Sequence, residues 1–294
     1  MTKTGGQQRP PWLRKEMKLS PEVLRTLREI GNLGLHTVCE SARCPNLGEC
    51  YQRGNATFLI LGEHCTRNCG FCAVDHGPPD PIDPEEGIKI ARYIELARIR
   101  FAVITSVTRD DLPDGGAAHF VRVAEDIRAR LPAVGLELLV PDFQGLGESI
   151  DAVAALPIDV FAHNVETVEA LYRRVRKGAD YRRSLELLSR ADKARRPGVR
   201  LKSGMMVGLG ESPEQLERLF GDLAAVGVEI LTIGQYLIPS KKNNPVVRYY
   251  NPEEFNELKV RAENEGIPYV LAGPYVRSSY MAEKAFRECV QKSV

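Results

Sequence analysis

The stretch LGEHCTRNCGFCAVDHG, residues 61–77, places Cys65, Cys69 and Cys72 within eight positions, directly after an apolar run. In a parallel α/β barrel, the loop that follows a strand carries active-site groups. A loop with this spacing can direct three sulfur atoms toward a single bound metal ion or cluster. Structural zinc takes four closed ligands, whereas an iron–sulfur cube held by three thiolates leaves one iron open for a cofactor. The spacing therefore favours an iron–sulfur cluster with an open iron.

Short apolar runs alternate with helical patterns from residue 56 onward. The runs are ATFLILG (56–62), FAVITSV (101–107), GLELLV (135–140), IDVFA (158–162), VRLKSGMMVG (199–208) and EILTIG (229–234). This alternation predicts parallel strands joined by crossover helices. Six units without a reversal of strand order favour an α/β fold of the partial (β/α)6 TIM-like barrel type, although an open sheet would give the same pattern. A further run, PYVLAG (268–273), either extends the sheet edge or lies outside it.

Helix starts divide the chain further. Ser20, Asp83 and Ser212 each precede a proline and an acidic residue, which predicts a capped helix start at each place. We expect an N-terminal extension with cluster ligands (1–55), a partial barrel (56–273) and a C-terminal extension (274–294). The two extensions are expected to cover the open end of the barrel.

Composition excludes several classes of protein. A chain of 294 residues can bury a sizeable core without disulfides or structural metals, so stability alone does not require its seven cysteines. The net charge of +1 gives no global sign of nucleic-acid or membrane binding. No signal-peptide pattern and no run of roughly 20 apolar residues is present, which favours a cytoplasmic location. Cytosolic disulfides are rare, so the cysteines are expected to bind metal.

A second triplet lies upstream in CESARCPNLGEC, residues 39–50, with Cys39, Cys44 and Cys50 at a spacing that matches none of the common zinc patterns. Two separate triplets indicate two clusters. Two alternatives remain open: a single zinc assembly of six cysteines, and a zinc site completed by one of the histidines His36, His64 and His76. Cys289, in a terminal helix, is interpreted as a buried small hydrophobe.

The aromatic Phe71 directly before Cys72 makes the 61–77 stretch resemble the radical S-adenosylmethionine (SAM) superfamily. That resemblance implies that the open iron binds the amino and carboxylate groups of SAM. One-electron reduction then releases a 5′-deoxyadenosyl radical that abstracts hydrogen from an unactivated carbon. The cofactor carries this chemistry, and the protein supplies orientation and exclusion of water.

The two triplets together with the C-terminal VRSSYMA (276–282) are similar to the lipoyl synthase family. The similarity extends over PPWLR (10–14), TSVTRDDLPDGGA (105–117), AHNVETV (162–168), LKSGMMVGLGE (201–211) and IGQYLIPS (233–240). It implies a sulfurtransferase of lipoate biosynthesis, which inserts two sulfur atoms at C6 and C8 of a protein-bound octanoyl-lysine. Implied cofactors are SAM and two 4Fe-4S clusters. Implied partners are an octanoylated lipoyl carrier domain or H protein and an electron donor such as flavodoxin or ferredoxin, with no membrane and no nucleic acid.

The resemblance also implies a role for each ligand. Cys65, Cys69 and Cys72 would hold the cluster that cleaves SAM, while Cys39, Cys44 and Cys50 would hold an auxiliary cluster that donates the sulfur. Ser279 would be the fourth ligand of the auxiliary cluster. An alkoxide is a poorer partner for iron than a thiolate, so it could leave first when sulfur is transferred.

Residues at the ends of barrel strands are expected to contact SAM. Asp114, Gly115 and Gly116 follow the second strand, where they contact the cofactor, form a turn before the next helix, or do both. The other expected contacts are Phe71, Thr105, Asn164, Glu166, Arg176 and Met206, with core packing as the alternative for Met206.

Residues 172–202 carry twelve Lys or Arg against three Asp or Glu. Such a run is usually a solvated helix face, and it could also steer an acidic carrier domain. Competing functions are sulfur insertion into a biotin precursor or a tRNA base, and a zinc-stabilised binding module without catalysis.

Overall fold

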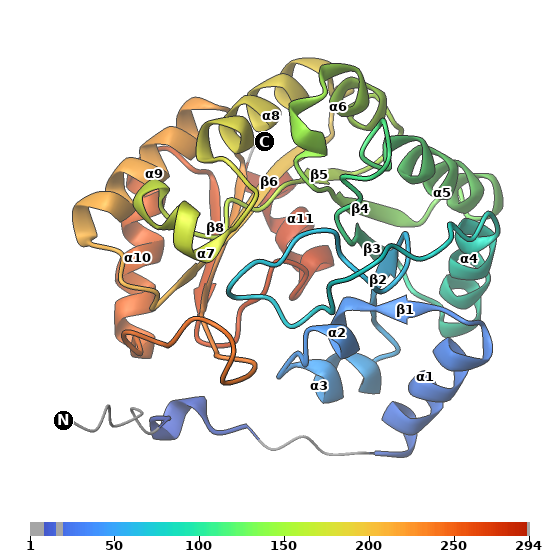
Figure 1. Ribbon diagram of the computed structural model, residues 1–294, viewed down its shortest axis with the longest axis horizontal. Coiled ribbons are helices and arrows are strands. Elements are labelled where there is room, and N and C mark those ends of the chain that lie inside the picture. The colour runs from blue at the N-terminus through green and yellow to red at the C-terminus, as the bar shows by residue number, and fades with distance from the viewer. Residues whose placement is uncertain (1–8, 16–19, 293–294) are drawn as a thin grey trace.

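The computed structural model describes residues 9–15 and 20–292, and its centre is one sheet of eight strands in the order β1 to β8 (Figure 1). The strands are β1 His36–Thr37, β2 Thr57–Ile60, β3 Phe101–Ser106, β4 Gly135–Leu139, β5 Val160–Ala162, β6 Arg200–Val207, β7 Ile230–Gln235 and β8 Tyr269–Gly273. Strands β2 to β8 are parallel, and β1 pairs antiparallel with β2. Strand order follows chain order without a reversal, as the sequence predicted for a partial barrel.

Helices cover the outer face of the curved sheet (Figure 1). The α-helices of the described residues are α1 Pro21–Asn32, α2 Val38–Ser41, α3 Leu47–Gln52, α4 Glu86–Ala97, α5 Ala117–Arg130, α6 Gly147–Ala154, α7 Tyr172–Val175, α8 Tyr181–Ala194, α9 Pro213–Ala225, α10 Pro252–Asn264 and α11 Ala282–Lys292. Short 3-10 helices are Pro11–Leu13, Phe143–Gly145 and Glu169–Leu171. Helix α11 differs from the outer helices because it packs against β3, β7 and β8 from within the curve of the sheet (Figure 1).

The predicted helix starts at Ser20 and Ser212 are confirmed. Ser20 Oγ accepts from Val23 N, and Ser212 forms a full capping box with Gln215. The start at Asp83 was wrong by two residues, because α4 begins at Glu86. Asp83 instead accepts from Glu85 N at 2.9 Å in a local turn, a competing use of an aspartate side chain.

The run 268–273 forms β8 and extends the sheet beyond the six predicted strands. In chain order the edges of the described sheet are β1 and β8, so the barrel stays open between them.

Both terminal extensions meet beside this opening. Asn46 Nδ2 donates to Tyr275 O at 2.7 Å, and Tyr280 Oη donates to Glu49 Oε1 at 3.1 Å. The α2–α3 segment and the segment before α11 are thereby held against each other. Among the described helices, none is long and apolar enough to cross a membrane.

Candidate active site

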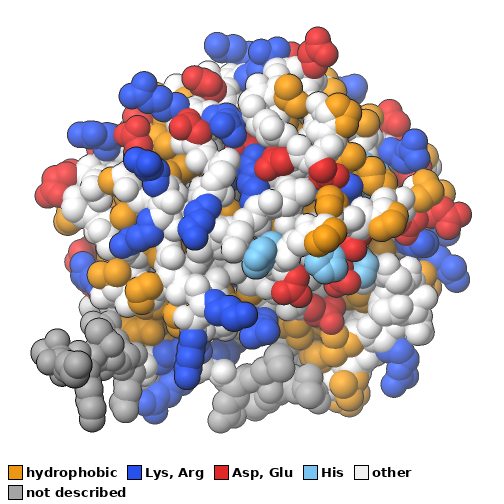
Figure 2. Space-filling view, viewed as in Figure 1, with side chains coloured by type: hydrophobic (Ala, Val, Ile, Leu, Met, Phe, Trp, Pro, Cys, Tyr) orange, Lys and Arg blue, Asp and Glu red, His pale blue; other side chains and the backbone are white. Residues whose placement is uncertain are grey.

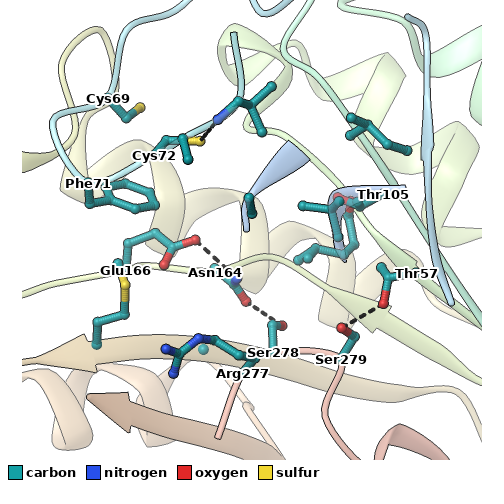
Figure 3. Close-up of a pocket in the computed structure, with 18 of the residues that line it drawn as sticks. Thr57, Cys69, Phe71, Cys72, Thr105, Asn164, Glu166, Arg277, Ser278 and Ser279 are labelled. Atoms are coloured by element: carbon teal, nitrogen blue, oxygen red, sulfur yellow. Dashed lines mark hydrogen bonds between the residues drawn. The ribbon is translucent and has the colours of Figure 1, made fainter. Parts of the chain in front are cut away.

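A cavity of about 340 Å³ lies at the carboxyl ends of the barrel strands (Figure 3). Its wall includes five of the six triplet cysteines, namely Cys39, Cys44, Cys65, Cys69 and Cys72, together with Ser279. The remaining wall residues that carry predicted roles are Phe71, Thr105, Asn164, Glu166, Arg176 and Met206. Residues far apart in sequence thus meet at one place, at the strand ends where the sequence predicted an active site.

The 65–72 triplet lies on the loop after β2, and backbone groups are directed at its sulfurs. Cys65 Sγ accepts from Arg67 N at 3.4 Å and from Thr108 N at 3.3 Å, and Cys72 Sγ accepts from Val74 N at 3.4 Å. Such N–H groups stabilise a thiolate. Burial raises the pKa of Cys69 to about 11 and that of Cys72 to about 12, so both are neutral thiols at neutral pH when no metal is bound.

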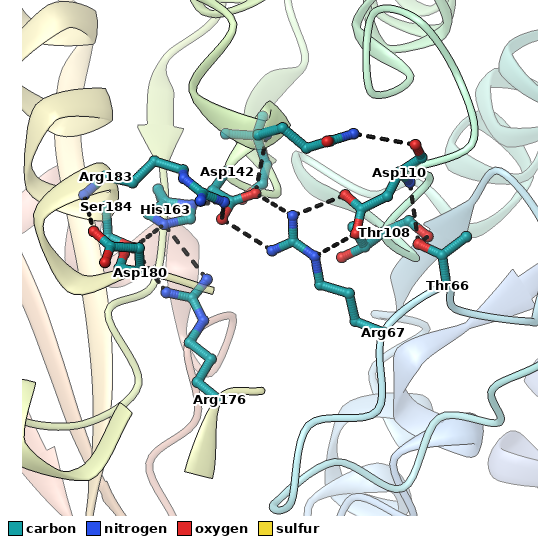
Figure 4. Close-up of polar contacts among 12 residues, drawn as sticks. Thr66, Arg67, Thr108, Asp110, Asp142, His163, Arg176, Asp180, Arg183 and Ser184 are labelled. Atoms are coloured by element: carbon teal, nitrogen blue, oxygen red, sulfur yellow. Dashed lines mark hydrogen bonds and ion pairs between the residues drawn. The ribbon is translucent and has the colours of Figure 1, made fainter. Parts of the chain in front are cut away.

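Arg67, inside the cysteine loop, holds that loop to two strand ends (Figure 4). Its guanidinium forms forked pairs with Asp110, at 2.6 and 2.8 Å, and with Asp142, at 2.9 and 2.7 Å. Arg183 adds a contact of 3.2 Å to Asp142, which is fully buried. Burial would raise the pKa of Asp142, but the Arg67 guanidinium outweighs it and lowers the pKa to about 2.

The 39–50 triplet lies between two cavities. Cys39 and Cys44 line both the large cavity and a second one of about 190 Å³, whereas Cys50 lines only the second. Burial raises the pKa of Cys39 to about 12 and that of Cys50 to about 11. These thiols too are suited to metal binding rather than to free thiolate chemistry.

Ser279 lines both cavities and joins the 39–50 triplet there. Its Oγ accepts a hydrogen bond from Thr57 Oγ1 at 2.7 Å (Figure 3). This bond leaves the serine hydroxyl with a proton to lose and a lone pair to donate, as a ligand to iron requires. The position therefore fits the ligand role expected for Ser279.

Asn164 connects the C-terminal segment to the end of β5 (Figure 3). Its Oδ1 accepts from Ser278 Oγ at 2.9 Å, and its Nδ2 donates to Glu166 Oε1 at 3.0 Å. Glu166 adopts a left-handed backbone, φ 65°, which is uncommon outside glycine and turns its side chain into the cavity. Burial raises the pKa of Glu166, with the Arg176 charge opposing.

Arg176 is buried at the cavity wall beside His163 (Figure 4). Its Nη1 donates to Ser184 Oγ at 2.9 Å and to Tyr172 Oη at 3.1 Å. Burial and the Arg176 charge lower the pKa of His163 to about 3, so this histidine is neutral. The Arg176 Nη2 also lies 3.5 Å from His163 Nε2. The Nε–H and one N–H of Nη2 have no partner among the described residues and remain for an anion in the cavity.

The cavity wall also contains a buried hydroxyl without a partner and two glycines that allow close packing. Ser106 Oγ is buried and has no hydrogen-bond partner among the described residues. At Gly204 a Cβ would lie 2.7 Å from Asn164 Oδ1, and at Gly234 it would lie 2.1 Å from Val276 O. These glycines let Asn164 and the segment before α11 pack closely against the sheet. The free hydroxyl of Ser106 and the sulfur donors on the cavity wall fit a bound SAM and iron–sulfur clusters.

Asp114, Gly115 and Gly116 do not line the cavity. Asp114 accepts from Gly116 N at 2.9 Å and from Ala118 N at 2.7 Å, which shapes the turn into α5. A Cβ at Gly116 would lie 2.5 Å from Leu61 Cδ1, so packing explains this glycine. Of the two roles that the sequence allowed for residues 114–116, this structure shows the turn before α5.

Within residues 9–15 and 20–292, no three His, Cys, Asp or Glu side chains lie so as to hold a single metal ion, and this is as true of the cysteine triplets as of the histidines. None of the three histidines lines either cavity at the cysteines. His36 pairs with Glu63 and His64 with Asp80.

Sequence reasoning missed Arg67, Asp142 and Arg277. Arg277 lines both cavities and lies next to Ser278 in the segment that faces Asn164 (Figure 3). The only sequence signal for Arg67 was its position between Cys65 and Cys69. Part of the charge of the basic segment is balanced, mostly by acidic residues outside it: Arg183 pairs with Asp142, Arg190 with Asp151, Arg195 with Asp192 and Glu229, and Arg200 with Glu229.

Comparison with known proteins identifies the family of the chain. The profile of the Radical SAM superfamily matches residues 59–223. The chain is 52% identical over 278 residues to a lipoyl synthase of Methylococcus capsulatus, covering 94% of this chain and 86% of that protein. It is 50% identical over 281 residues to a lipoyl synthase of Acidithiobacillus ferrooxidans, covering 95% and 88%.

Solved structures share the fold at low sequence identity. Methylornithine synthase matches with a TM-score of 0.53 at 13% identity, over 93% of this chain and 95% of that one. HydG, a maturase of the FeFe hydrogenase, matches with a TM-score of 0.58 at 14% identity, over 92% and 66%.

Proposed function

Because the chain belongs to the lipoyl synthase family of the radical SAM superfamily, its activity is sulfur insertion that forms the lipoyl group, and we propose how its own residues perform it. The observation that carries the proposal is the single cavity bordered by both cysteine triplets and Ser279. An octanoyl chain in that cavity would lie within reach of a hydrogen-abstracting centre and of a sulfur source.

Each ligand set has a separate task in this proposal. Cys65, Cys69 and Cys72 hold the SAM-cleaving 4Fe-4S cluster, and Cys39, Cys44, Cys50 and Ser279 hold the auxiliary one. When bound, these groups supply a 5′-deoxyadenosyl radical from SAM and the two sulfur atoms that replace one hydrogen each at C6 and C8. The chain itself binds and orients these groups and the substrate, and it excludes water from the cavity.

Polar residues on one side of the cavity hold SAM. We assign the carboxylate of its methionine part to Arg176, and other polar groups of SAM to Asn164, Glu166 and the free hydroxyl of Ser106. Phe71, Thr105 and Met206 complete the wall. The carboxylate suits Arg176 because a guanidinium can bind it by two parallel hydrogen bonds.

Apolar residues on the other side hold the acyl chain. Leu59, Val107, Leu139 and Met205 line the space between the triplets and present no hydrogen-bonding side chain. An octanoyl group gains free energy by burial there, and the exclusion of water protects a carbon radical. Thr57 orients Ser279 by its hydrogen bond.

The division into an N-terminal extension (1–55), a partial barrel (56–273) and a C-terminal extension (274–294) is part of this proposal, since each supplies ligands. The substrate is carried by a lipoyl carrier domain or H protein, and flavodoxin or ferredoxin supplies electrons. The location is cytoplasmic. The pairing of four arginines in residues 183–200 with acidic residues disfavours the alternative of a tRNA substrate.

Reconstitution with iron and sulfide without oxygen tests the proposal. With reductant, SAM and an octanoylated carrier domain, the carrier should gain two sulfurs and lose two hydrogens by intact mass. Cys65→Ala should abolish formation of 5′-deoxyadenosine, whereas Cys44→Ala should keep it and abolish sulfur transfer. Lipoyl formation by the Cys44 variant would contradict the assignment of the 39–50 triplet.

A further inference from the structure

The outer side of the 65–72 loop is framed by two segments from elsewhere in the chain. Gly70 N donates to Val175 O at 2.8 Å, and Asn244 N donates to Gly70 O at 2.7 Å. Asn243 Nδ2 donates to Cys72 O at 2.8 Å, and Cys69 Sγ lies 4.0 Å from Lys177 O. The end of α7 and the loop after β7 therefore flank the part of the loop that carries Cys69 and Cys72.

These two flanking segments carry six exposed cations. Arg174 donates to Leu209 O and Arg248 pairs with Glu254, and the other four, Arg173, Lys177, Lys241 and Lys242, are called the basic rim. In the part of the chain that the structure describes, no acidic side chain is within ion-pairing distance of any of the four. This contrasts with Arg183 nearby, which pairs with Asp142. No rim residue lines either cavity at the cysteines, so a molecule on the rim leaves the substrate cavity free.

Charge on this face is divided. Lys and Arg side chains gather over the region of α7, while His side chains and a group of Asp and Glu lie on the other side of the centre (Figure 2). Exposed Glu63 and Asp75 belong to the far arm of the same cysteine loop. An acidic molecule approaching this face is therefore attracted to the basic rim and repelled from the opposite arm.

We propose that the basic rim is the docking surface of a small acidic protein that carries single electrons and reduces the group held by the 65–72 triplet. The inference rests on the proposed function, which requires one electron for each SAM cleaved. In the step, the docked carrier is oxidised by one electron and that group is reduced by one. Docking on the rim places the carrier beside Cys69, where little protein separates the sulfur from solvent.

The test compares two reductants on the protein with both clusters loaded. In the variant Lys177→Glu/Lys241→Glu/Lys242→Glu, reduction by flavodoxin hydroquinone, followed by loss of visible absorbance, should slow by about tenfold or more at low salt. The deficit should shrink as salt screens the charges. Reduction by dithionite, a small reductant, should keep its wild-type rate. Oxidised flavodoxin should also bind the iron-free variant more weakly in a fluorescence titration.

A matched control changes net charge equally on the outer helices. Arg122, Lys193 and Arg218 are exposed residues of α5, α8 and α9, and Arg122→Glu/Lys193→Glu/Arg218→Glu should reduce at the wild-type rate with either donor. Equal flavodoxin rates in the rim variant and the wild type would overturn the inference. The inference would also be overturned if dithionite reduced the rim variant as slowly as flavodoxin does. It would be overturned as well if the rim variant bound the octanoylated carrier more weakly than the wild type but bound flavodoxin equally well. Failure of the wild type to cleave SAM with dithionite would overturn the proposed function, and the inference with it.

Discussion

Thr57, on the first parallel strand, donates a hydrogen bond of 2.7 Å to Ser279, which lies 222 residues later in the chain. The bond joins the barrel to the C-terminal segment at the point where both face the 39–50 triplet. In the iron-ligand role that we propose for Ser279, this bond would matter, because hydrogen bonds to a metal ligand fix its orientation and basicity.

Removing Ser279 or its hydrogen bond from Thr57 should weaken binding of the cluster that we propose at the 39–50 triplet. In a background without the 65–72 triplet, Ser279→Ala should release iron to a chelator roughly tenfold to a hundredfold faster, and Thr57→Val should show a smaller increase. Thr105→Val is the control, because Thr105 lines the same cavity but donates to Leu139 O at 3.0 Å. Iron release at one common rate from all the variants would argue against Ser279 as a ligand.

The pair of Arg67 and Asp142 predicts a specific dependence of stability on pH. The pKa of Asp142 falls from 3.8 to about 2 in the folded protein. A lowered pKa stabilises the fold above the unfolded value, and this stabilisation is lost as pH falls from about 4 through about 2. Urea unfolding of the iron-free protein should show Asp142→Asn less stable by about 2 kcal/mol at pH 6, with the difference shrinking toward pH 2.

Asp110→Asn serves as the comparison, because Asp110 pairs with the same arginine but is partly exposed. Its effect should be smaller, since water screens an exposed charge pair. A constant difference between wild type and Asp142→Asn across this pH range would show that the carboxylate charge is not what stabilises the loop.

Much of the fold could be predicted from local sequence. Strands such as Phe101–Ser106 are apolar runs between helical patterns, and Ser212 with Gln215 is a local capping signal. The cysteine spacing likewise located the site, because the loop after the first parallel strand must lie at the carboxyl end of the barrel. These features depend on residues that are close in sequence.

What sequence could not give are contacts between distant polar residues. The bond from Arg67 to Asp142 spans 75 positions, and neither residue has a periodic pattern that identifies a partner. Asp114 likewise has two uses, in a turn or toward a ligand, that look the same in sequence, and only the packing of Gly116 against Leu61 separates them. The charge of the basic segment was similarly misleading, because its partners, such as Glu229, lie elsewhere in the chain.

A buried ion pair within the barrel predicts opposite effects of single and double substitution. Lys202 Nζ lies 2.7 and 2.8 Å from the oxygens of Glu137, and both side chains are 1% exposed. Lys202→Met alone should lower the free energy of unfolding by about 3 to 5 kcal/mol, because a buried carboxylate loses its partner. Lys202→Met with Glu137→Leu should recover most of that loss in urea unfolding.

The exposed pair of Arg190 and Asp151 is the matched control for this measurement, with a distance of 2.6 Å. Arg190→Met should change the free energy of unfolding by less than about 1 kcal/mol. If the double variant at Glu137 and Lys202 were no more stable than the single one, the pair would contribute through packing rather than charge.

Arg176 is the residue on which the proposed orientation of SAM depends most. Arg176→Met should weaken equilibrium binding of SAM to the cluster-loaded protein by about tenfold or more, because an anion in the cavity loses a forked donor. Arg176→Lys should not restore affinity, since an ammonium cannot hold Tyr172 and Ser184 while also pairing with a carboxylate. Arg183→Met is the control, because Arg183 contacts Asp142 but does not line the cavity. Wild-type SAM affinity in Arg176→Met would remove Arg176 from the binding site and leave its contacts to Ser184 and Tyr172 as its whole role.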